Sequence, residues 1–258
     1  MREKIDKKKN LVVGLGEIGY PLFKLISKVW ACDGCDNNSK IMSKKFEKYD
    51  SLSISLMHIC IPYSNKFEKN IVKLVNKFQP EVVVIHSTIK PSTTNKIQQK
   101  ISIPVIYSAT RGVHKRMLYD LKRYTKFFAI ESSAPQKKKA YEAFEKVMKK
   151  CGVKTKRMSD PITLELAKIV TDTSYYGWLI NYAQISNILA KKHGVDYDEM
   201  WSFSDEIHKF LRNRPKMIPG FIGGHCVIPN LDLLNDKNLR GVNTINSKYK
   251  KFLGYKLE

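Results

Sequence analysis

Three glycines near the start of the chain have the spacing of a turn that binds phosphate groups. Gly14, Gly16 and Gly19 form a Gly-x-Gly-x-x-Gly motif that follows the apolar run 11–13 and precedes a helical pattern. In such a turn the first glycine permits the bend, the second lets the backbone approach a pyrophosphate, and the third allows close helix packing. The free N–H groups and positive dipole end of the following helix favour phosphate. The motif therefore predicts nucleotide binding.

An acidic residue after the second strand would complete such a site. The segment 28–33 is predicted as that strand, and Asp33 follows Gly14 by nineteen positions. A carboxylate near this spacing binds the adenine ribose hydroxyls of a dinucleotide. It favours NAD over NADP, because it would repel a 2′-phosphate. The alternative is an ordinary glycine turn, with Asp33 as a solvated strand end.

Strand and helix patterns alternate along the first part of the chain and position this turn. Short apolar or β-branched runs are typical of buried strands, and segments with helical periodicity separate them. The later predicted strands cover 56–62, 81–86, 104–107, 126–130 and 153–158, and the helices cover 66–78, 91–100 and 135–150. This alternation predicts an α/β fold with a Rossmann-type, doubly wound and mostly parallel sheet.

The pattern changes near residue 159. A long helical pattern over 160–193 precedes a second helix over 198–211, a loop rich in Pro and Gly over 215–229, and a polar tail. We therefore predict a dinucleotide-binding domain over 1–159 and a smaller helical domain over 160–258.

Composition narrows the class of protein. The chain has 258 residues and a net charge of +22, carried mostly by lysine, which attracts anions. No apolar run approaches the roughly 20 residues of a membrane span, and the charged start does not resemble a secretory signal. We expect a cytoplasmic protein without membrane contact, and no nucleic acid, because no motif for it is present. Five cysteines argue against a disulfide framework, and Cys32-x-x-Cys35 alone does not predict a metal site.

Four segments together resemble the UDP-glucose/GDP-mannose dehydrogenase family. They are Gly14–Leu22, Ser87–Thr94, Glu165–Lys168 and Gly223–Pro229, in the family's order and across most of the chain. The Gly-Gly-His-Cys loop is the most specific of them, because in that family it presents the catalytic thiolate. The resemblance implies an enzyme that oxidises an alcohol of a sugar nucleotide with NAD, through a cysteine thioester. It also implies a homodimer that forms through the helix over 160–193; the alternative is that this helix is buried against the chain's own sheet.

The resemblance assigns roles to particular residues. Cys226 and Lys168 are expected at the reacting carbon, where a thiolate attacks an aldehyde and an ammonium group stabilises an oxyanion. Alternatively, Cys226 is a small buried residue and Lys168 a solvated helix lysine. The full set of expected catalytic residues is Cys226, Lys168, Asp172, Asn230 and Thr88, and the expected cofactor-binding residues are Gly14, Gly16, Glu17, Ile18, Gly19, Asp33, Pro62, Ser87 and Thr88.

The chain also departs from the family's pattern. Thr110 stands where the family carries a glutamate that activates water, and a threonine cannot act as a base at neutral pH. Asp172 and Asn230 stand where the family has asparagine and aspartate, respectively. The residues after the cysteine loop are too few for the family's third domain, so we expect a short member without the nucleotide-sugar-binding domain and with a sugar-like or small anionic substrate.

Two other functions stay open. The 3-hydroxyacid dehydrogenase group also joins a Rossmann domain to a helical domain and has a helix lysine, although the cysteine loop favours the sugar-nucleotide family. A repurposed Rossmann protein would bind NAD as a sensor or use S-adenosylmethionine for methyl transfer. The changed residues and the missing domain favour that second alternative.

Overall fold

The chain forms two compact units, Met1–Leu166 (unit 1) and Ala167–Glu258 (unit 2). The computed structural model describes residues 8–38, 40–42, 48–49, 51–224 and 226–254. The sequence predicts a domain boundary between residues 159 and 160, whereas helix α6 (Pro161–Leu166) belongs to unit 1. The reason is that α6 packs on strands β5 and β6.

The described part of unit 1 contains one seven-stranded sheet with the order β2-β1-β3-β4-β5-β6-β7. All neighbouring strands are parallel except β5 and β6, which are antiparallel. The fold is therefore the Rossmann-type, mostly parallel α/β sheet that the sequence predicts. The strands are β1 (Lys8–Val13), β2 (Cys32–Cys35), β3 (Ser53–Ile59), β4 (Val82–Ile85), β5 (Val105–Tyr107), β6 (Lys126–Ile130) and β7 (Thr155–Arg157).

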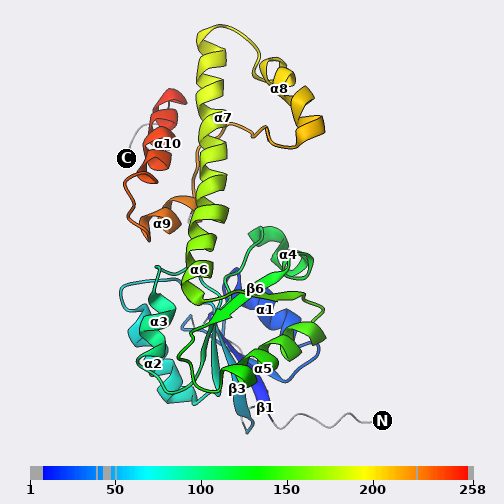
Figure 1. Cartoon of the computed structure of the whole chain (residues 1–258), viewed down its shortest axis with the longest axis vertical. Coiled ribbons are helices and arrows are strands. Elements are labelled where there is room, and N and C mark those ends of the chain that lie inside the picture. The colour runs from blue at the N-terminus through cyan, green and yellow to red at the C-terminus, as the bar shows by residue number, and fades with distance from the viewer. Residues whose placement is uncertain (1–7, 39, 43–47, 50, 225, 255–258) are drawn as a thin grey trace. The chain divides into compact units, whose positions relative to one another are not determined.

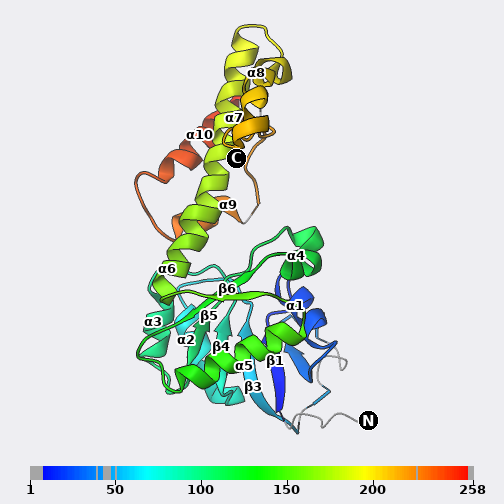
Figure 2. The ribbon, with the colours of Figure 1, turned by 45° about the vertical axis from the view of Figure 1, so that its right-hand side comes forward.

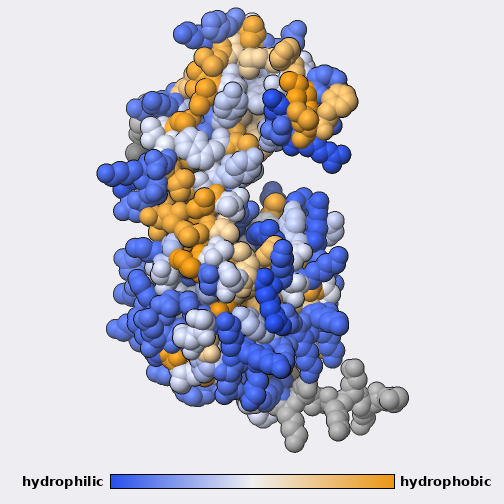
Figure 3. All heavy atoms as spheres, in the orientation of Figure 1, coloured by the Kyte–Doolittle hydropathy of each residue, from blue (hydrophilic) through white to orange (hydrophobic). Residues whose placement is uncertain are grey.

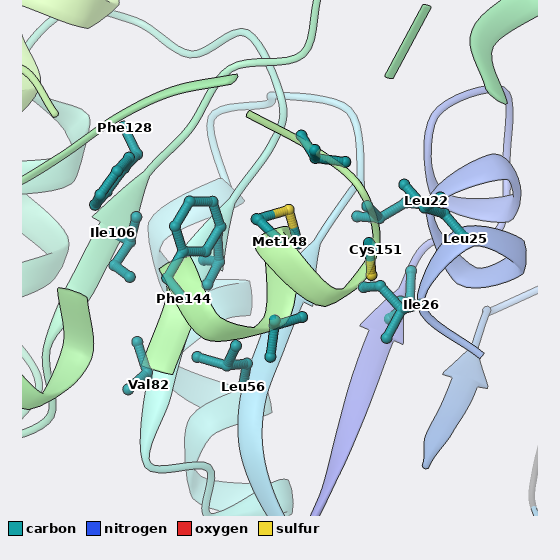
Figure 4. Packing of buried hydrophobic residues seen from close by; sticks show 14 of the residues in the cluster. Leu22, Leu25, Ile26, Leu56, Val82, Ile106, Phe128, Phe144, Met148 and Cys151 are labelled. Carbon is teal, nitrogen blue, oxygen red and sulfur yellow. The ribbon is translucent and has the colours of Figure 1, made fainter. Parts of the chain in front are cut away.

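Helices cover both faces of this sheet (Figures 1 and 2). Besides α6, they are α1 (Gly19–Ile26), α2 (Phe67–Phe78), α3 (Thr93–Gln98), the 3₁₀ turn η2 (His114–Arg116), α4 (Met117–Arg123) and α5 (Lys137–Lys150). Two separate hydrophobic clusters lie against the two faces. In one of them, Phe144 and Met148 of α5 pack against strand residues such as Leu56 and Ile106 (Figure 4). Burial of each such side chain contributes about 1.5–3 kcal/mol.

Unit 2 is helical. It begins with a π-helical segment, η3 (Ala167–Ser174), and continues directly into α7 (Tyr175–Lys192), followed by α8 (Tyr197–Leu211), α9 (Val227–Asp232) and α10 (Arg240–Phe252). A small core of Ile169, Ile222, Val227, Leu231 and Val242 joins η3, α9 and α10. Among the described helices of both units, none is long and apolar enough to cross a membrane.

Two sequence predictions for unit 2 need correction. The sequence predicts a loop throughout 215–229, but α9 begins at Val227 and includes Pro229, which is tolerated in the first turn of a helix. The polar tail contains α10, whose Val242, Asn246 and Tyr249 are buried at helical spacing. Only three residues of α10 face inward, so its sequence is mostly polar.

Candidate functional site

The glycine turn has the geometry of a dinucleotide-binding loop, and we call residues 14–19 the dinucleotide loop. Gly14 has φ +88°, which disfavours any side chain. A Cβ on Gly19 would lie 1.6 Å from the Gly14 carbonyl oxygen, so only glycine allows α1 to begin there. A Cβ on Gly16 would meet no atom within 4 Å, so the space beside Gly16 is open. The three glycines thus have three different roles.

Helix α1 starts at this loop, so the positive end of its dipole lies there. Its N-terminus has no side-chain cap, and its first turn carries no acidic residue. Glu17 is exposed and Ile18 is half-buried, on the turn that leads into the helix. A helix N-terminus in this state favours a phosphate group.

Asp33 lies away from the position that the sequence predicted for a ribose-binding carboxylate. Strand β2 begins only at Cys32, so Asp33 is its second residue and pairs in register with Leu11. Its side chain is buried, bonds Lys9 Nζ at 2.6 Å, and accepts the backbone N–H groups of Lys48 and Tyr49. These partners give Asp33 a structural role in holding the segment after β2.

Asp36 takes the place at the end of β2 that the prediction gave to Asp33. Its Oδ2 accepts the backbone N–H of Leu15 at 2.6 Å, inside the dinucleotide loop. Its Oδ1 accepts the N–H of Asn38 at 2.8 Å. A carboxylate has about four acceptor positions, so Asp36 retains capacity for ribose hydroxyls. The sequence contained the signal, because both Asp33 and Asp36 lie near the required distance from Gly14.

The other predicted cofactor residues of unit 1 follow strands β3 and β4. Pro62 is exposed, Ser87 is buried, and Thr88 is half-buried. The Ser87 hydroxyl donates to the Ile61 carbonyl at 2.5 Å, which joins the two segments. Because β1, β3 and β4 are adjacent and parallel, these residues lie at the same carboxyl edge of the sheet as the dinucleotide loop. Ligands of open α/β sheets bind at this edge.

Glu165 has a role that sequence reasoning did not assign. The carboxylate accepts the N–H of Ser92 at 2.5 Å, and the N–H and hydroxyl of Thr94 at 3.0 and 2.6 Å. Burial raises the pKa of Glu165, while these hydrogen bonds oppose that rise. Glu165 therefore links the start of α3 to α6 within unit 1.

A buried polar row crosses the strands close to this edge. The Nδ1 of His58 lies 2.9 Å from the Nε2 of His86, and the Nε2 of His58 lies 3.3 Å from the Oδ1 of Asn10. Burial lowers the pKa of His58 to about 3, helped by the positive charge of Lys126. The same two causes, burial first, hold the pKa of His86 well below its usual range. Both imidazoles are therefore neutral.

Thr110, at the position of the family's glutamate, belongs to the same buried neighbourhood. Its hydroxyl accepts from the Lys126 ammonium group at 3.2 Å, and the Ser108 carbonyl accepts from the same group at 3.1 Å. All three residues are buried. Lys126 thus fixes the segment after β5, and Thr110 is held as a hydrogen-bond partner rather than as a base.

In unit 2, Lys168 and Asp172 form the pair that their spacing allows. The Lys168 Nζ lies 2.6 Å from the Asp172 Oδ2, and the Asp172 side chain is 45% exposed. Both residues lie on the π-helical segment η3, and π-helical turns are frequent at functional sites. Helix α9, which carries the half-buried Asn230, packs against η3.

Cys226 is exposed and directly precedes α9. Residue 225 of the Gly-Gly-His-Cys motif lies outside the described residues. The residue after the cysteine, Val227, packs close to Gly177 of α7, where an added Cβ would lie 3.0 Å from the valine Cγ1. Gly177 therefore lets the end of the cysteine loop approach the long helix.

Buried amides hold the segment that leads into the cysteine loop. The Asn246 side chain accepts the Ile222 N–H at 2.8 Å and donates to the Ile222 carbonyl at 3.0 Å. Gln184 of α7 donates to the Gly220 carbonyl at 2.6 Å and to the Asn246 Oδ1 at 3.1 Å. Side-chain amides that satisfy a loop backbone in this way fix its path. No sequence pattern predicts this network, because its members are far apart along the chain.

Three cysteines of unit 1 have raised pKa values, and the exposed Cys226 lies in unit 2. Burial raises the pKa of Cys60 to about 12 and that of Cys151 to about 11. The pKa of Cys32 is also raised, again by burial first. In the part of the chain that the structure describes, no three or more His, Cys, Asp or Glu side chains gather as metal ligands would.

Solved structures resemble this chain, although no protein-family model and no curated protein sequence matches it. The UDP-D-ManNAc dehydrogenase of Pyrococcus horikoshii superposes with a TM-score of 0.78 at 20% identity, covering 95% of this chain and 69% of that one. The 3-hydroxyisobutyrate dehydrogenase of Mycobacterium tuberculosis superposes with a TM-score of 0.66 at 13% identity, covering 96% and 94%.

A third similar structure is the NDP-N-acetyl-D-galactosaminuronic acid dehydrogenase of Methanosarcina mazei Go1. It has a TM-score of 0.72 at 15% identity, and the match covers 97% of this chain and 68% of that one. The chain therefore has a dehydrogenase-like Rossmann fold. Within that class, nucleotide-sugar dehydrogenases and a 3-hydroxyacid dehydrogenase both share its architecture.

Proposed function

We propose that the chain is an NAD-dependent oxidoreductase that oxidises an alcohol of a sugar-like or small anionic substrate. The observation that carries the proposal is the dinucleotide loop, where Gly16 leaves open space and Asp36 contacts Leu15 from the end of β2. In this proposal the pyrophosphate lies beside Gly16 and the N-terminus of α1. The ribose hydroxyls bind Asp36, and Ser87 and Thr88 line the neighbouring edge.

The chemistry requires a hydride acceptor and a group that stabilises charge at the alcohol oxygen. NAD, when bound, accepts the hydride from the alcohol carbon. We assign the oxygen to Lys168, whose ammonium group Asp172 orients at 2.6 Å. Cys226 supplies a nucleophile for the aldehyde that results. Because Thr110 replaces the family's glutamate, we expect a product that stays at the aldehyde level, with one NADH formed per substrate.

Cofactor titration tests the first part of the proposal. Calorimetry with NAD and with S-adenosylmethionine should show binding of NAD, and binding of the methyl donor alone would exclude a dehydrogenase. Asp36→Asn should weaken NAD binding by about tenfold to hundredfold, as expected for lost hydrogen bonds to a charged group. The matched variant Asp33→Asn should instead lower stability, because it breaks the buried pair with Lys9.

A substrate panel tests the second part. NADH absorbance would be followed with UDP-N-acetylhexosamines and with 3-hydroxy acids. The M. tuberculosis structure, matched over nearly its whole length, makes the 3-hydroxyacid class the second candidate. For an active sugar nucleotide, Cys226→Ala should still form one NADH per substrate but should release the aldehyde more readily, because no thiol adds to it. An unchanged rate of aldehyde release would remove the thiol from the mechanism.

We also propose that the protein is a homodimer, because the large apolar side chains of α7 lie on its exposed face and not on the face that packs inside unit 2. Its buried residues inside unit 2 are small or polar, including Asn181, Gln184 and Asn187. Its exposed residues are large and apolar at heptad spacing, namely Tyr175, Trp178, Tyr182, Ile185 and Leu189, with exposures of 57, 38, 63, 37 and 48%. Hydrophobic side chains are visible at the surface of unit 2, whereas unit 1 is mostly hydrophilic in this view (Figure 3).

An exposed apolar stripe of this length marks an interaction surface. Light scattering should give twice the chain mass, and Tyr182→Glu should yield a monomer. The exposed Lys191→Glu, on the same helix but out of the heptad register of the stripe, serves as the matched control. A monomeric unsubstituted protein would exclude the dimer.

A further inference from the structure

Glu17 places a carboxylate within the loop that would hold a pyrophosphate. Its side chain is 53% exposed and it directly follows Gly16, beside which the structure is open. A negative charge so close to two phosphate groups opposes their binding. The protein therefore needs a means to compensate this charge if the loop binds a dinucleotide.

His114 provides a partner for that carboxylate. Its Nδ1 lies 2.9 Å from the Glu17 Oε2, and the contact joins the 3₁₀ turn η2 to the dinucleotide loop inside unit 1. The neighbouring Lys115 is exposed and adds positive charge to the same turn. One turn thus carries both the imidazole that contacts the loop and an exposed lysine.

The turn η2 is anchored independently of Glu17. The buried Asp120 of α4 accepts the Val113 N–H at 2.9 Å and the Arg116 Nε–H at 3.0 Å. Gly112 has φ +142°, and an added Cβ would lie 2.7 Å from the Asp120 Cβ. Helix α4 in turn packs on α1. The hydrogen bonds to Asp120 and the packing of α4 on α1 therefore hold His114 beside the dinucleotide loop.

We infer that His114 is a positioning residue for the dinucleotide: it neutralises Glu17 and so allows the pyrophosphate to occupy the loop. The inference rests on the proposed function and deepens it by naming the group that controls cofactor affinity. Removal of His114 takes this partner away from the Glu17 carboxylate and so increases its repulsion of the pyrophosphate. Removal of both side chains should restore NAD binding, because the carboxylate that repels the pyrophosphate is lost together with the histidine that pairs with it.

A double-mutant cycle tests this coupling. NAD affinity would be measured by calorimetry at low salt, where ion pairs are least screened, for the unsubstituted protein, His114→Ala, Glu17→Gln and the double variant. His114→Ala should raise the Kd about threefold to fivefold, as for a well-formed surface ion pair. In the Glu17→Gln background it should change the Kd by less than about 1.5-fold.

Lys115→Ala is the matched control, since it removes a positive charge from the same turn without touching Glu17. Its effect should be equal in both backgrounds. An equal effect of His114→Ala in both backgrounds would overturn the inference while NAD binding itself survives. Absence of NAD binding to the unsubstituted protein would instead refute the proposed function and the inference together. If His114→Ala lowers the unfolding temperature, His114→Gln replaces it in the cycle.

Discussion

The buried pair of His58 and His86 should make the protein sensitive to moderate acid. An unfolded histidine has a pKa of about 6.5, whereas burial lowers the pKa of folded His58 to about 3. Between these two pH values His58 is protonated in the unfolded chain but neutral in the folded chain. The stability that the neutral imidazole contributes is fully present above about pH 6.5. It is lost progressively as the pH falls toward 3.

The size of this effect can be estimated for one pH step. Each pKa unit corresponds to about 1.36 kcal/mol, and an unfolded histidine is already half protonated at pH 6.5, so a fall to pH 4.5 costs about 2.3 kcal/mol from His58 alone. His86, whose pKa is lowered in the same direction, adds to this loss. A loss of this size is a large fraction of the stability of a typical domain, about 5–15 kcal/mol.

Urea unfolding, followed by near-ultraviolet circular dichroism at several pH values, measures the slope. His58→Gln removes the titrating group and retains hydrogen-bonding capacity toward Asn10 and His86, so its stability should fall less steeply between pH 6.5 and 4.5. His193→Gln is the matched control, since His193 is exposed, and should leave the slope unchanged. An equal slope in His58→Gln and the unsubstituted protein would refute the assignment.

Three further predictions concern the glycines and the thiols. Gly16→Ala should leave the unfolding temperature unchanged but abolish NAD binding in calorimetry. Gly19→Ala should prevent folding, because its Cβ would overlap a backbone oxygen. Equal thermal stability of the two variants would contradict this geometry. Gly177→Ala should destabilise unit 2 by about 1–3 kcal/mol in urea unfolding, despite the better helix propensity of alanine, because two valine methyl groups must move; a gain in stability would contradict this packing. Iodoacetamide should modify exposed Cys226 long before Cys60, whose pKa is raised to about 12. Peptide mass spectrometry measures the order of modification, and faster labelling of Cys60 would contradict this prediction.

The sequence predicted the fold because its signals are local. Alternating apolar strands and helices require a layered α/β sheet, and the spacing of Gly14, Gly16 and Gly19 requires one kind of turn. These patterns depend only on the periodicity of secondary structure and on the backbone freedom of glycine. Helix α10 was missed for the same reason, since three inward residues in thirteen give a weak periodic signal.

The tertiary structure decided which side chains meet. Asp33 and Asp36 both fit the spacing of a ribose-binding carboxylate, and the start of β2 at Cys32 decides between their roles. Asp33 lies within the strand and pairs with buried Lys9, whereas Asp36 follows the strand and accepts the Leu15 N–H. The contact of Glu17 with His114 joins residues nearly one hundred positions apart, which no local pattern encodes. The sequence by itself thus located the glycine turn at which we propose that a dinucleotide binds. The register of strands and the packing of helices determined which charges surround it, because charge interactions depend on distances in space.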